Sequence, residues 1–96
     1  MDRETFEAQL RADGFDEVLN RRVEASDPPP LHTHDFDVRI LMLEGVFVLE
    51  QASNTRRYRP GEIFEVPAGT LHGESFGPTG AAYVAGRRRR PGMPMA

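Results

Sequence analysis

The chain has 96 residues, 39% of them hydrophobic, and a formal net charge of -3. This length suits one domain with a single core, and the acidic balance argues against nucleic acid as the main partner. The sequence contains no cysteine, which excludes disulfides, thiolate metal ligands and cysteine nucleophiles. All twelve basic residues are arginine, so lysine Schiff-base chemistry is excluded as well.

The first predicted element is a short helix over residues 3–12. Phe6 and Leu10 lie four residues apart on one face, and Asp13-Gly14 supplies a stop because glycine accepts the left-handed conformation of a helix end. The N-terminus lacks a basic segment followed by an apolar one, and the longest apolar run, Ile40–Leu43, is too short to span a bilayer. We therefore expect a cytoplasmic protein with no membrane partner.

From residue 17 onward the pattern changes to short apolar runs punctuated by glycine and proline, which indicates an all-β fold. Their spacing of about eight to twelve residues is typical of small sandwiches and barrels. The predicted strands are Val18–Glu24, Leu31–His34, Val38–Leu43, Val46–Gln51, Arg56–Arg59, Ile63–Val66, Leu71–Phe76 and Ala81–Ala85. We expect one domain over residues 1–96, with the barrel over about 17–86 and a flexible tail over 87–96.

Two of these strands, on either side of a hairpin predicted at Glu44-Gly45, are apolar at nearly every position. A strand with one solvent-exposed face would alternate apolar and polar residues, so both faces of this hairpin should be covered. One cover is the barrel interior. The other is the N-terminal helix or the same hairpin of a second subunit, and the second alternative makes a homodimer the expected assembly.

The three histidines of the chain fall on two of the predicted strands. His32 and His34 are two residues apart, so both rings should project to one face of a strand, and His72 lies in a second strand-turn-strand segment. Imidazole nitrogen suits transition metals better than magnesium or calcium. The pattern therefore predicts one divalent transition metal, whether Fe, Zn, Ni, Mn or Co, held by these three residues.

These segments resemble the two motifs of the cupin superfamily. His32, His34 and Gly45 match the first motif, and Gly61, Pro67, Gly69 and His72 match the second without an insertion. The resemblance covers roughly residues 31–85. It implies a cupin-type antiparallel β-barrel, a double-stranded β-helix or jelly roll, with the metal at the barrel mouth.

The chain departs from the family motifs at three positions. Ser26 stands at the first-motif glycine, Val38 or Arg39 at the glutamate that would be a fourth ligand, and Phe76 at the second-motif asparagine. The remaining set of three histidines is similar to that of thiol dioxygenases of the same superfamily. Those enzymes are larger, and some carry a cysteine-tyrosine crosslink that this chain cannot form.

Other side chains could complete the site. Glu74 should share the inward face of His72 and is predicted to be a catalytic acid/base group or a fourth ligand. Asp37 and then Asp35 are the next candidate ligands, if the strand bulges there. Four residues are predicted to bind the ligand: Arg39, Tyr58 and Tyr83 as hydrogen-bond donors, and Phe76 as an apolar wall.

Three functions remain open from the sequence. The first is a metalloenzyme of oxygenase or isomerase type that acts on a small organic molecule. The second is a non-catalytic domain that binds or senses a small molecule, and the third is a metal-free barrel that serves partner contacts. The basic run Gly86–Arg90 is read as a solvated strand end or tail and not as a nucleic-acid site.

Overall fold

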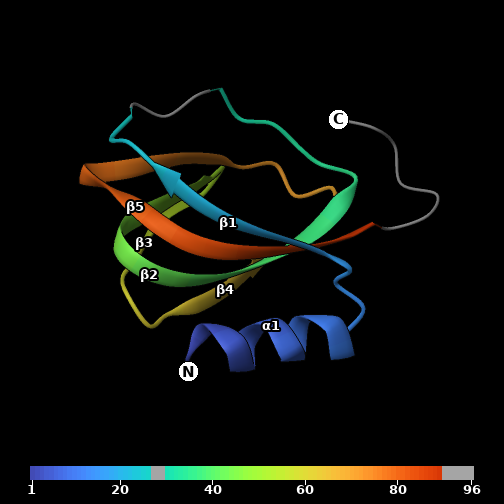
Figure 1. Ribbon diagram of the computed structural model, residues 1–96. Helices are drawn as coiled ribbons and strands as arrows, with labels where there is room; N and C mark the ends of the chain where they lie inside the picture. Colours follow the sequence, from blue (N-terminus) through green and yellow to red (C-terminus); the bar gives the residue numbers. More distant parts are fainter. Residues whose placement is uncertain (27–29, 90–96) are drawn as a thin grey trace.

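The computed structural model describes residues 1–26 and 30–89. In this part of the chain one helix precedes five strands: α1 (Arg3–Ala12), β1 (Glu17–Val23), β2 (Phe36–Gln51), β3 (Asn54–Tyr58), β4 (Ile63–Val66) and β5 (Gly73–Arg89). All the ladders are antiparallel, in the order β1-β5-β2-β3, with β4 paired to β2. The predicted all-β fold with a short N-terminal helix is confirmed (Figure 1).

The two long strands β2 and β5 carry the barrel, since each bends and pairs with the other along most of its length. The register between them shifts on both sides of Gly45, whose φ is +75°. A Cβ at Gly45 would lie 2.0 Å from the carbonyl oxygen of Gly80, so only glycine permits this close approach. The hairpin predicted at Glu44-Gly45 is therefore wrong: the chain bends there without reversing, and the two predicted strands are halves of β2.

The same correction applies to other predicted boundaries. The segments predicted at 71–76 and 81–85 are halves of the single strand β5. The strand predicted at Leu31–His34 is reduced to an isolated bridge between His32 and His72. Arg87–Arg89 continue β5, so the tail predicted over 87–96 is wrong for its first three residues, while 90–96 lie outside the described residues.

The core has two parts, one on each side of the β2–β5 ladder. Inside the barrel, side chains from β2, β4 and β5 form one cluster of buried residues: Ile40, Met42, Phe47, Leu49, Phe64, Val66, Ala81, Tyr83 and Ala85. Outside it, Leu41 and Val84 pack against Phe6 and Leu10 of α1 and against Phe15. The apolar run is thus covered on both faces, and α1 is the outer cover (Figure 1).

The helix α1 begins and ends where the sequence predicts. The Asp2 side chain caps its first turn by accepting a 2.8 Å hydrogen bond from the Thr5 amide, and Gly14 follows its end with a φ of +86°. Phe6 and Leu10 are fully buried against the sheet. Gly86 permits this close packing, since a Cβ there would lie 2.5 Å from Leu10 Cδ2. Among residues 1–26 and 30–89, no helix is long and apolar enough to cross a membrane.

Candidate metal centre

The three histidines come together at one end of the barrel. His32 and His72 exchange backbone hydrogen bonds of 2.8 and 2.9 Å across their isolated bridge, which places the two rings side by side. The ring centroid of His34 lies 4.7 Å from that of His32 and 5.1 Å from that of His72. One candidate ligand atom from each ring lies within 4.8 Å of the others, so the three rings could hold a single ion.

The backbone around two of the rings holds them in the orientation that a metal requires. Nδ1 of His72 lies 2.9 Å from the Thr70 carbonyl oxygen, and Nδ1 of His32 lies 3.2 Å from that of Pro30. In each ring a protonated Nδ1 donates to the carbonyl, which leaves Nε2 with a free lone pair. Such outer hydrogen bonds accompany most metal-ligating histidines. The donor set therefore fits a transition metal.

The turn Pro67–Gly69 connects the histidine segments. The Gly69 amide donates a 2.9 Å hydrogen bond to the carbonyl of His34, and the Ala68 amide donates a 2.8 Å bond to the Asp37 carboxylate. Gly69 has a φ of +81°, a conformation that glycine adopts without strain. The turn therefore has a structural role, since it ties the start of β2 to the segment that leads into His72.

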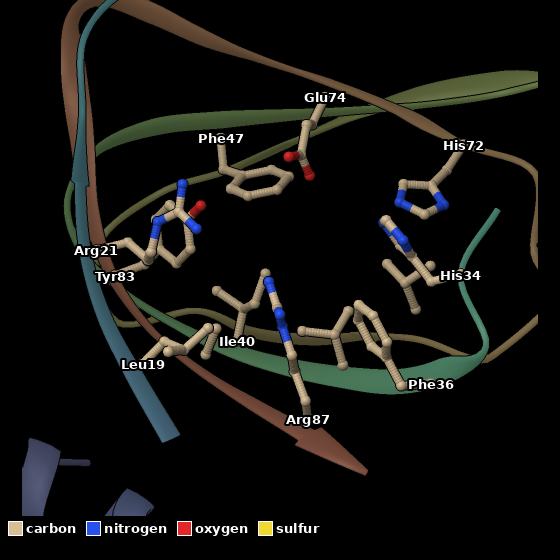
Figure 2. Close-up of a pocket in the computed structure, with 13 residues that line it drawn as sticks. Leu19, Arg21, His34, Phe36, Ile40, Phe47, His72, Glu74, Tyr83 and Arg87 are labelled. Carbon is tan, nitrogen blue, oxygen red and sulfur yellow. The ribbon is translucent and has the colours of Figure 1, made fainter. Parts of the chain in front are cut away.

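The barrel interior next to the histidines is a cavity of about 70 Å³ (Figure 2). Its walls are mostly apolar: Leu19, Phe36, Val38, Ile40, Phe47, Val66 and Ala85. Six polar side chains also line it: Arg21, His34, His72, Glu74, Tyr83 and Arg87. Figure 2 shows the Glu74 carboxylate directed into the cavity from the start of β5, two residues after His72, so its predicted inward orientation is confirmed.

The surroundings of the cavity favour a neutral His34 imidazole and a neutral Tyr83 phenol. Burial lowers the pKa of His34, and the nearby His32, His72 and Arg87 lower it further against the opposing effect of Asp35. Burial and the Glu74 carboxylate raise the pKa of the Tyr83 hydroxyl, against the opposing effect of nearby arginines. At neutral pH the cavity thus offers the His34 lone pair and the Tyr83 phenol proton.

The other two predicted carboxylate ligands lie away from the histidine cluster. Asp37 is buried, and besides the Ala68 amide it accepts bonds of 2.8 and 3.1 Å from the guanidinium of Arg88. Asp35 forms an ion pair with Arg89. By alternation along β2 the Asp37 side chain points out of the barrel, and no bulge is found between β2 and β5 at this point to turn it inward. The prediction that either completes the metal site is wrong.

Three of the predicted ligand-binding residues do not line the cavity. Arg39 faces the helix side of β2, where it pairs with Asp13 and Glu65 and lies over the Phe15 ring. Tyr58 stacks on Phe64, with ring centroids 3.9 Å apart. Phe76 packs edge-on against Phe47 in the core. Of the four residues predicted to bind the ligand, only Tyr83 lines the cavity, because each of the other three side chains contacts other residues instead.

The sequence reasoning missed the two arginines of the cavity, Arg21 and Arg87. Tyr83, Ala85 and Arg87 share the inward face of β5 by strict alternation, and Arg21 lies directly opposite Tyr83 on β1. That period of two was the available signal. For Arg87 the signal was lost because this strand was predicted to end at Ala85.

No protein-family model and no curated protein matches the chain. Solved structures do. An RmlC-like cupin from Shewanella frigidimarina matches with a TM-score of 0.64 and 19% identity, over 78% of this chain and 67% of that one. A cupin-2 domain protein from the same organism matches with a TM-score of 0.60 and 19% identity, over 76% of this chain and 69% of that one. KdgF from a Halomonas species matches with a TM-score of 0.60 and 24% identity, also over 76% of this chain and 69% of that one. At these identities the similarity concerns the fold.

Proposed function

We propose that this chain, which has the cupin fold, is a metal-dependent enzyme of the isomerase type that moves a proton on a small organic molecule. The observation that carries the proposal is the position of Glu74, an ionisable carboxylate that shares one cavity with two of the three clustered histidines. A cavity with three metal ligands but no further acid or base would support binding alone.

His32, His34 and His72 would hold the ion. Once bound, a divalent metal supplies Lewis-acid polarisation of a ligand oxygen, which acidifies the neighbouring C–H bond. The Glu74 carboxylate is placed to accept that proton and to return it to an adjacent carbon, so the reaction needs no co-reactant. The Tyr83 hydroxyl, kept protonated by its raised pKa, is placed to donate a hydrogen bond to a ligand oxygen.

The apolar walls support the same role. Phe47, Val66 and the other apolar side chains limit the water around Glu74, which strengthens its interaction with a bound ligand. The cavity of about 70 Å³ accommodates a few non-hydrogen atoms of that ligand, since one water needs about 10–15 Å³ on the same measure.

Exchange of carbon-bound protons tests the proposal. The protein loaded with zinc or iron(II) is incubated in D₂O with a panel of small sugars, 2-oxo acids and diketones, and deuterium uptake is followed by NMR. We expect uptake with at least one compound, and its loss in Glu74→Gln at unchanged metal content. Oxygen consumption by the iron(II) form without exchange would overturn the isomerase assignment in favour of an oxygenase. Ligand binding without either reaction would favour a sensing domain.

A further inference from the structure

Arg87 occupies an unusual position for a guanidinium. Its side chain leaves β5 and extends into the middle of the cavity, opposite the wall that carries Glu74 (Figure 2). The guanidinium carbon lies 4.7 Å from the centre of the Phe36 ring, which supports it from one side. The side chain as a whole is only 35% exposed.

One edge of this guanidinium has no partner. Within residues 1–26 and 30–89 its only hydrogen bond runs from Nη1 to the Glu17 carboxylate, at 3.2 Å. Nε is fully buried and unpaired. A buried donor without an acceptor is unfavourable, so its persistence at a cavity wall points to an acceptor that comes from outside the chain.

The geometry of the free edge identifies that acceptor. Nε–H and one Nη2–H of arginine point in parallel and match the two oxygens of a carboxylate, which they bind as a pair of charge-assisted hydrogen bonds. Glu17 uses Nη1 and leaves the donors of this edge unpaired among the described residues. A second cation, Arg21, lines the cavity next to Tyr83, and the two arginines face the single carboxylate of Glu74. A bound metal would add further positive charge.

We infer that Arg87 binds the carboxylate of the substrate, and that the substrate is a small organic acid with a short apolar body. The inference rests on the proposed function, because it names the substrate class of the same cavity. The apolar side chains that surround Arg87 accommodate the carbon body, and the volume of about 70 Å³ limits it to roughly five non-hydrogen atoms. Propionate is the matching probe.

Propionate binding to the metal-free protein tests this inference by itself. In the presence of a chelator, an NMR titration compares propionate with neutral propionamide and with inorganic phosphate. We expect propionate to bind at least about tenfold more tightly than propionamide, with the largest shifts around the cavity, because the free edge of Arg87 is charge-assisted. Equal binding of the two would overturn the inference, and tighter binding of phosphate would overturn the carboxylate assignment.

Variants connect the binding to Arg87. Arg87→Gln should weaken propionate binding about tenfold or more, and Arg87→Lys, which keeps the charge but loses the fork, should weaken it by about threefold or more. Glu17→Gln removes the ion pair but not the free edge and should retain binding. Arg57→Gln, on the exposed face of β3, is the matched control and should match the wild type. Unchanged binding in both Arg87 variants would overturn the inference.

The two proposals fail separately. Metal content and proton exchange do not enter the titration of the metal-free protein, so a chain that binds propionate through Arg87 but holds no metal would overturn the proposed function alone. A metal-loaded protein that exchanges protons, but whose propionate binding is unchanged by the Arg87 substitutions, would overturn the substrate class alone.

Discussion

Removal of the Asp37 carboxylate should destabilise the fold and weaken the metal site together. Asp37 is 2% exposed and accepts hydrogen bonds from the Arg88 guanidinium at 2.8 and 3.1 Å and from the Ala68 amide at 2.8 Å. Removing one partner of a buried pair costs about 3–5 kcal/mol, and a lost amide bond about 1 kcal/mol. Because the Arg88 side chain is 35% exposed, water partly replaces its lost partner, which brings the expected total for Asp37→Ala to about 3–4 kcal/mol.

That loss is large for a domain of this size, whose free energy of unfolding is expected at about 5–14 kcal/mol. Urea denaturation of the metal-free protein measures it. Asp37→Asn keeps an acceptor for Ala68 and should lose about 2 kcal/mol. The matched control is Asp35→Asn, which breaks the outer ion pair with Arg89 and should cost about 1 kcal/mol or less. Metal affinity should fall in Asp37→Ala, because the Pro67–Gly69 turn loses its tie to β2. Equal stability of Asp37→Ala and the control would refute the reasoning.

Further predictions concern the tyrosine, the helix and the assembly. In the Tyr58→Phe variant, the remaining tyrosine, Tyr83, should ionise above the usual pKa of 10.0. Because its folded pKa is raised, the stability that it contributes is present below pH 10 and is lost as the pH rises through the folded pKa. An ultraviolet titration midpoint at or below pH 10 would contradict this. Gly86→Ala should lower the free energy of unfolding by about 1–3 kcal/mol, and by less in a Leu10→Ala background, since the new methyl meets the Leu10 side chain. The homodimer stays a prediction: light scattering should give the mass of two chains, and 10.8 kDa alone would contradict it.

The sequence predicted the elements whose signals are local. The spacing of Phe6 and Leu10 with the stop at Asp13-Gly14 located α1 to the residue, and the apolar run of β4 was located equally well. The second-motif spacing predicted that His72 joins His32 and His34, which the structure confirms. For α1 and β4 a few neighbouring residues determine the outcome.

The errors come from contacts between distant residues. A glycine after a charged residue is typical of a hairpin, but Gly45 lies at a bend within β2. A glycine is required there because the backbone of Gly80, far along the chain, packs against it. Arg39 was expected to bind a ligand, and it pairs instead with Asp13, a residue brought near only by α1 packing on the barrel. From the sequence, Arg87 was interpreted as part of a solvated basic run. The structure shows that β5 continues through this residue.

The amount of metal that the chain holds tests the central claim most directly. Metal-free protein is titrated with cobalt(II), and the visible absorption and the heat of binding are both recorded. The three-histidine site predicts one ion per chain, and loss of affinity by more than about a hundredfold in His72→Ala, with Arg57→Gln unchanged as the control. Absence of stoichiometric binding, or equal affinity in His72→Ala, would contradict the account.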